Sequence, residues 1–143
     1  MMKPYTLETD VPLICMPAPL FPEEVLETHQ CLHSLVPGMD NRRFFGLSWF
    51  NAQKEVVYWA AVEELRAQEA ESLGCRPFVL PKGPYMSILI KDFKKDIPAI
   101  GQAFTQLMAL PETGEDSICV EYYPNMSDVL CLVKLRSHQP KFK

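Results

Sequence analysis

The chain has 143 residues, a formal net charge of −4, 48% hydrophobic residues and 22% charged residues. This size is typical of one domain with its own core, so we expect residues 1–143 to form a single domain. An acidic chain is a poor partner for nucleic acid, because phosphate binding needs a basic surface. We find no signal peptide and no apolar run long enough to cross a membrane, and the five cysteines form no CxxC pair. We therefore expect a cytoplasmic protein with reduced thiols and no direct nucleic-acid or membrane partner.

The first half of the chain predicts a strand, a helix and a hairpin. The polar residues 1–10 are expected to be a lead-in without regular structure. Pro22 and the two glutamates after it favour a helix start, since proline and acidic side chains suit the first turn. Pro37 and Gly38 end that helix. The expected elements are, in order, Val11–Met16, Pro22–Val36, Arg43–Phe50 and Glu55–Glu63.

The second half predicts a hairpin, a helix and a last hairpin, after a polar connection over Glu64–Gly74. Asp96 is a suitable N-cap for the helix, and Pro111 follows its end. Ile100, Phe104, Leu107 and Met108 fall on one side of it at helical spacing. The four expected strands are Arg76–Leu80, Tyr85–Lys91, Ser117–Tyr123 and Val129–Leu135.

The two halves match each other in the order of their elements. Each is a β-α-β-β unit, the first over about 11–63 and the second over about 85–135. We expect an α+β fold, in which the duplicated units form one antiparallel sheet with two helices on one face. The opposite face, or the seam between the halves, is then free to form a ligand cleft.

The segment Ser117–Asn125 (SICVEYYPN) places a carboxylate between apolar and aromatic residues of a strand. If the apolar side chains of each strand face the helices, alternation puts Glu121, Tyr123, Tyr85 and Trp59 together on the other face. Alternation does not fix the face of Trp49. A glutamate on the polar side of an ordinary strand is also compatible with this pattern, and then Glu121 is simply solvated.

Three segments together resemble the GyrI-like, or AraC-type effector-binding, family, including its stand-alone members carried on integron cassettes. They are FFGLSWFNAQKEVVYWAAVE (44–63), FVLPKGPYMSILIK (78–91) and ICVEYY (118–123). The family's YWA-type strand falls on Tyr58-Trp59-Ala60. Its Pro-x-Gly-x-Tyr turn falls on Pro81, Gly83 and Tyr85, and its pocket glutamate falls on Glu121.

The resemblance implies a cleft that binds lipophilic, often cationic, aromatic molecules. Glu121 is then the charge anchor, and the ring-bearing candidates around it are Trp49, Tyr58, Trp59, Tyr85 and Tyr123. The family's regulators carry DNA-binding helices before this domain, whereas ten residues precede the first expected strand here. We therefore expect a non-catalytic, stand-alone binding protein, with a separate regulatory protein as a possible partner.

Two other functions are open. Some family members hydrolyse strained, cyclopropane-bearing electrophiles, for which Glu121 could position water or a proton. Others act on gyrase as protein-interaction modules.

His29 and His33 lie one helical turn apart, a spacing that suits either a metal or packing against the core. No carboxylates cluster with them, and no phosphate loop or nucleophile motif occurs, so we expect no metal site and no cofactor.

Overall fold

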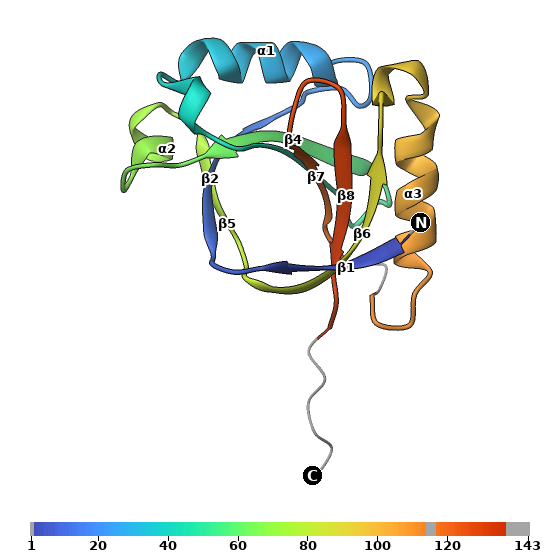
Figure 1. Ribbon diagram of the computed structural model, residues 1–143. Coiled ribbons are helices and arrows are strands. Elements are labelled where there is room, and N and C mark those ends of the chain that lie inside the picture. The colour runs from blue at the N-terminus through green and yellow to red at the C-terminus, as the bar shows by residue number, and fades with distance from the viewer. Residues whose placement is uncertain (1, 114–116, 137–143) are drawn as a thin grey trace.

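The computed structural model describes residues 2–113 and 117–136 and shows an eight-stranded antiparallel sheet that curls around its own side chains (Figure 1). The three α-helices are α1 (Val25–Leu35), α2 (Glu69–Ser72) and α3 (Pro98–Met108), and short 3₁₀ turns span Met39–Asn41 and Phe93–Lys95. The strands are β1 (Met2–Leu7), β2 (Val11–Pro17), β3 (Phe44–Phe50), β4 (Val56–Glu63), β5 (Arg76–Leu80), β6 (Gly83–Ile90), β7 (Cys119–Tyr123) and β8 (Val129–Lys134).

The strand order is β1-β6-β8-β7-β3-β4-β2-β5, and it has the same sequence of elements on both sides of its centre. β3 and β7 pair at the middle, where Gly46 stands opposite Glu121. Moving outward, β4 and β8 come next, then β2 and β6, then the edge strands β5 and β1. The order β2-α1-β3-β4 therefore recurs as β6-α3-β7-β8, which confirms the expected α+β fold built from two β-α-β-β units.

The long helices α1 and α3 both pack on the outside of the curl (Figure 1). Leu32 of α1 is fully buried against Ala60 and Val62 of β4. Phe104 and Leu107 of α3 pack against β6 and β8, as their helical spacing predicts. Each helix therefore covers the sheet of its own half.

The inside of the curl holds a second apolar layer of the sheet. Its buried side chains include Leu13, Phe45, Leu47, Val120 and Leu132. The sheet is consequently apolar on both faces, as happens when a sheet is covered on both sides.

Two expectations about the strands were wrong. Residues 1–10 are not an irregular lead-in, because Met2–Leu7 forms β1 and pairs with β6 at the sheet edge. Only Leu7 of this strand is buried, so its sequence lacks a clear apolar alternation.

Arg76–Leu80 and Tyr85–Lys91 do not form a hairpin with each other. β5 pairs with β2, whereas β6 pairs with β1 and β8. Gly83 has φ 131, a conformation that favours glycine. It lets the chain leave β5, at one edge of the sheet, and enter β6, which lies beside the opposite edge strand β1. The backbone N–H of Lys82 donates to Asp10 Oδ1 at 2.8 Å and ties this turn to the β1–β2 turn.

Cys15, Cys119 and Cys131 are buried and Cys31 is exposed, and all five cysteines are free thiols. Within the described part of the chain, no helix has the length and apolar character needed to cross a lipid bilayer.

Candidate functional site

A large cavity lies between α1 and α3, over the central strands where the two halves of the sheet meet. Its volume is about 1130 Å³. Its walls are mostly apolar, and besides two tyrosines they include six large aromatic side chains from the helices, strands and connecting segments, namely Phe21, Phe44, Trp49, Phe50, Phe93 and Phe104. The cavity therefore has the aromatic, largely apolar lining of a small-molecule site.

Glu121 supplies a carboxylate at the sheet side of this cavity. Its side chain points from β7 toward the helices and is only 9% exposed. The hydroxyl of Tyr58 donates to Glu121 Oε1 at 2.7 Å, and the hydroxyl of Tyr123 donates to the same oxygen at 2.5 Å. Among residues 2–113 and 117–136, no Lys or Arg forms an ion pair with Glu121.

Gly46 makes the contact between Tyr58 and Glu121 possible. Tyr58 lies on β4 and Glu121 on β7, so the tyrosine must cross over β3 to reach the acid. A Cβ atom on Gly46 would lie 2.0 Å from Tyr58 Oη and 2.6 Å from Glu121 Oε1. The missing side chain of Gly46 therefore provides the space in which these two groups meet.

Burial dominates the electrostatics of the site. It raises the pKa of the Glu121 carboxyl above its usual value, and the hydrogen bonds from Tyr123 and Tyr58 offset part of this increase. It also raises the pKa of both phenols, with the Glu121 charge adding to the effect. A carboxylate without a counter-ion in such surroundings favours either its neutral form or the arrival of a cation.

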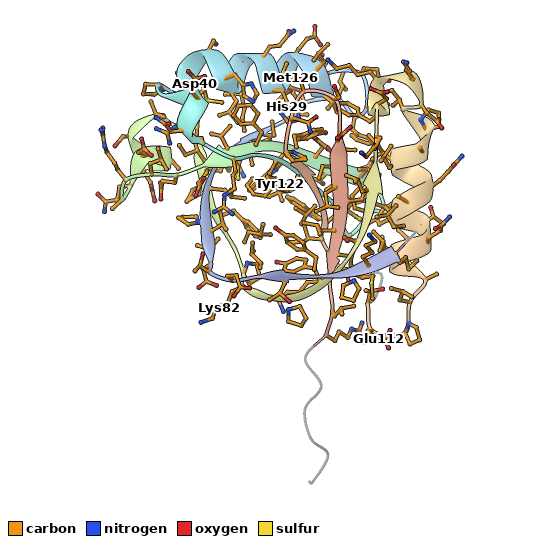
Figure 2. All side chains as sticks on the ribbon, viewed as in Figure 1. His29, Asp40, Lys82, Glu112, Tyr122 and Met126 are labelled. Carbon is orange, nitrogen blue, oxygen red and sulfur yellow. The ribbon has the colours of Figure 1, made fainter. Side chains whose placement is uncertain are left out.

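His29 of α1 adds a fourth polar side chain to the group formed by Glu121, Tyr58 and Tyr123. Its Nε2 lies 2.8 Å from Tyr58 Oη, and Figure 2 shows its ring on the side of α1 that faces the sheet. Burial, with a smaller contribution from His33, lowers the pKa of His29 to about 4, so the ring is neutral at pH 7. The ring of His33 packs on Phe44 with centroids 4.7 Å apart. The described residues contain no group of three or more His, Cys, Asp or Glu side chains suited to a metal ion.

The structure brings some of the sequence candidates together and separates others. Glu121, Tyr58 and Tyr123 form one hydrogen-bonded group at the cavity, and Trp49 borders the cavity while also packing on the inner layer of the curl.

Trp59 and Tyr85 lie on the other face of the sheet, inside the curl. Trp59 packs edge-on against Trp49, and Tyr85 borders a smaller hollow of about 270 Å³ while its hydroxyl donates to the Pro81 carbonyl.

The expectation that Glu121 shares a face with Trp59 and Tyr85 was wrong because of β7 alone. Val120 and Tyr122 of this strand point into the curl, as Figure 2 shows for Tyr122, instead of toward the helices. Glu121 and Tyr123 therefore face the helices, on the same side as Tyr58.

Sequence reasoning missed Gly46 and the phenylalanines that close the cavity. A glycine inside a strand is a recognised sign of close approach by another group, so Gly46 could have been predicted to lie beside such a group. Phe21 lies in a turn before α1 and Phe93 in the short 3₁₀ turn before α3, and such short segments have no periodicity that would indicate where a side chain points.

No protein-family model and no curated protein matches this chain. Solved structures do. An integron cassette protein from the mobile metagenome of Vibrio cholerae is similar, with a TM-score of 0.69 over 94% of this chain and 95% of that chain at 11% identity. SAV2435 bound to tetraphenylphosphonium has a TM-score of 0.56 over 94% of each chain at 13% identity. A hydrolase from Listeria innocua has a TM-score of 0.54 over 94% of this chain and 90% of that chain at 8% identity. At such identities the likeness shows a common fold.

Proposed function

We propose that this protein binds lipophilic aromatic cations in the cavity between α1 and α3, with Glu121 as the charge anchor. The observation that carries the proposal is a buried carboxylate without a counter-ion at the sheet side of a large aromatic cavity. Of the described residues that line this cavity, the one other with a full charge is Lys94, which is exposed at its rim.

A bulky cation satisfies each feature of the site. It supplies the positive charge that Glu121 lacks, in surroundings where the attraction is less screened than in water. Aromatic faces within about 6 Å of the charge add cation–π attraction of roughly 0.5–2 kcal/mol each. The apolar remainder of the ligand contributes about 25 cal/mol per Å² buried, before the cost of association.

One of the solved structures with this fold supports the proposed class of ligand. SAV2435, which shares the fold, was solved with tetraphenylphosphonium, a lipophilic cation. The resemblance to GyrI-like effector-binding proteins implies the same ligand class, and we propose that the chain is a stand-alone member of that group.

A titration with tetraphenylphosphonium, followed by intrinsic fluorescence, tests the function. We expect saturable binding and much weaker binding of neutral triphenylphosphine oxide. Glu121→Gln keeps the shape of the side chain and removes the charge, so it should weaken cation binding at least tenfold and leave the neutral compound unaffected. Glu8→Gln, on the exposed β1–β2 turn, is the matched control and should bind like the parent. Equal affinity of Glu121→Gln and parent for the cation would refute the charge-anchor role.

A second candidate is hydrolysis of a strained electrophile, favoured by the hydrolase among the fold neighbours and by the acid–phenol group itself. Glu121 would position water or a proton there, with a tyrosine hydroxyl assisting. Mass spectrometry of a cyclopropane-bearing electrophile incubated with the protein separates the two functions. Product formation that is lost in Glu121→Gln supports hydrolysis, and an unchanged compound leaves binding alone.

A further inference from the structure

Four polar groups form one continuous hydrogen-bonded chain from the cavity to α1. Tyr123 and Tyr58 both reach Glu121 Oε1, and Tyr58 also reaches His29 Nε2. The links from Glu121 to Tyr58 and from Tyr58 to His29 are 2.7 and 2.8 Å long. This chain runs across the seam between the halves, because Glu121 and Tyr123 belong to the second half and Tyr58 and His29 to the first.

The hydrogen atoms of this chain have two complete arrangements. When Glu121 is ionised it only accepts, so Tyr58 donates to Glu121 and His29 must donate its Nε2–H to Tyr58. When Glu121 is protonated, its O–H can donate to Tyr58, and Tyr58 then donates to an unprotonated His29 Nε2, with the imidazole hydrogen on Nδ1. Neutral imidazole can donate or accept at the same nitrogen, so no group in the chain loses its partner in either arrangement.

We propose that the binding of a cation expels one proton from Glu121 and reverses the hydrogen bonds of the Glu121–Tyr58–His29 chain. This inference rests on the proposed function of the cavity.

The reversal balances in atoms and charge. The carboxyl O–H bond of Glu121 breaks and its proton goes to Tyr58. The former hydroxyl proton of Tyr58 goes to His29 Nε2, and the proton on His29 Nδ1 passes to water. The site is neutral before binding and neutral afterwards, when the cation faces the carboxylate.

The groups around Glu121 favour this exchange. Tyr58 from β4, Tyr123 from β7 and His29 from α1 are all neutral at pH 7, since burial raises the pKa of the phenols and lowers that of the imidazole to about 4. The remaining titratable groups that face the site or lie beside it are His33 on α1, Cys119 on β7, Cys131 on β8 and the exposed Lys94 at the rim.

None of these groups provides a buried positive charge. Burial lowers the pKa of His33, and it raises the pKa of Cys119 to about 11 and of Cys131 to about 12. The free protein therefore holds Glu121 with its proton more readily than an exposed glutamate, and burial raises the pKa of its carboxyl accordingly.

Calorimetry with tetraphenylphosphonium counts the protons released. This probe carries a permanent charge, so a proton that appears on binding comes from the protein. Titrations in two buffers of different ionisation enthalpy, repeated between about pH 5 and pH 9, give the number per cation. We expect the release to approach one proton per cation below the pKa of Glu121, where the affinity rises about tenfold per pH unit, and to fall toward zero above that pKa. Glu121→Gln should release none at any pH.

Nitrogen-15 spectra of labelled histidine test the reversal in the free and bound protein. We expect the hydrogen of His29 to move from Nδ1 to Nε2 when tetraphenylphosphonium is added, and also when the pH of the free protein is raised. His29→Gln assigns the signal, keeps a donor and an acceptor at this position, and should retain the proton release. His29→Leu leaves Tyr58 without an acceptor beside the protonated acid, so it should lower the proton count at a given pH.

The outcomes separate the inference from the function on which it rests. Tight binding that depends on Glu121 but releases no proton anywhere in this range overturns the exchange and leaves the binding function intact. Absence of cation binding overturns the proposed function. In that case a His29 tautomer that stays the same across the pH range of the free protein overturns the reversal, and a tautomer that changes with pH supports it.

Discussion

Gly46→Ala is the substitution that most directly tests the architecture of the site. It adds one methyl group at a position where both neighbouring strands bring a polar atom close to the backbone. Real Cβ atoms do not approach other atoms to 2.0 or 2.6 Å, which are the distances to Tyr58 Oη and Glu121 Oε1. The tyrosine must therefore move away from the acid, and the hydrogen bond between them is lost.

The cost has two parts. Overpacking of a buried site costs about 1–3 kcal/mol, and a buried polar group that loses its hydrogen-bond partner costs about 1–3 kcal/mol. We expect Gly46→Ala to lower the free energy of unfolding by about 2–5 kcal/mol, and to weaken the binding of tetraphenylphosphonium more than tenfold. Urea denaturation measures the first effect and fluorescence titration the second.

A matched control and a rescue variant make this test specific. Gly101 lies in α3 with nothing within 4 Å of an added Cβ, so Gly101→Ala should stabilise the protein by up to about 1 kcal/mol. Tyr58→Phe removes the oxygen that the new methyl would meet at 2.0 Å. The double variant of Gly46→Ala with Tyr58→Phe should therefore lose less stability than the sum of the two single changes, with a coupling of about 0.5–3 kcal/mol. Additive effects, or a Gly46→Ala protein as stable as the parent, would show that Tyr58 does not occupy the space above Gly46.

Three further outcomes are expected. Both indoles pack on the inner layer of the curl with centroids 5.1 Å apart, and of the two only Trp49 also borders the cavity. Fluorescence quenching by a bound cation should therefore fall more in Trp49→Phe than in Trp59→Phe, and an equal fall in the two variants would contradict the contact of Trp49 with the ligand. The raised pKa of Glu121 means that the parent loses stability as the pH rises from about 4.3, the ordinary value, through that pKa. Urea midpoints of Glu121→Gln should lack this loss, and parallel pH profiles would contradict it. The pKa of Glu69 is lowered to about 2 by its hydrogen bonds with Arg42, so the stability it contributes above about pH 4.3 is lost as the pH falls toward 2. Glu69→Gln should remove that acid-dependent part, and an unchanged acid profile would argue against the pair.

The sequence predicts most of the fold because the signals for each helix and strand lie within the segment that forms it. The apolar spacing of Phe104 and Leu107 is a signal within a single helix, and it placed the buried side of α3 correctly. Asp96, the expected N-cap, lies one residue before the actual N-cap Ile97, and no side chain caps this helix. Pairings between distant segments carry no such signal. The pairing of β5 with β2 joins residues more than 60 positions apart, and a proline-flanked turn between β5 and β6 favoured a hairpin that does not form.

The orientation of β7 shows why the site was only half predictable. Alternation separates the two faces of a strand, but it identifies the helix-covered face only when the other face is polar. Both faces of this sheet are buried, so Val120 and Tyr122 were free to point into the curl while Glu121 pointed outward. The alternation rule does hold for β4, where Tyr58, Ala60 and Val62 occupy alternate positions and all pack under α1.

The position of Glu121 at the centre of the sheet has a physical consequence for how the site is built. Neither half of the protein contains this hydrogen-bonded chain alone, since Tyr58 and His29 come from the first half and Glu121 and Tyr123 from the second. The two units meet at β3 and β7, where a buried acid without a cation partner reduces stability. A fold that needed only stability would place an apolar side chain opposite Gly46. An acid at this position, with two phenols bonded to it and an imidazole bonded to one of the phenols, is what the proposed binding of a cation requires, and the cavity beside it has the size and the aromatic walls to admit such a ligand.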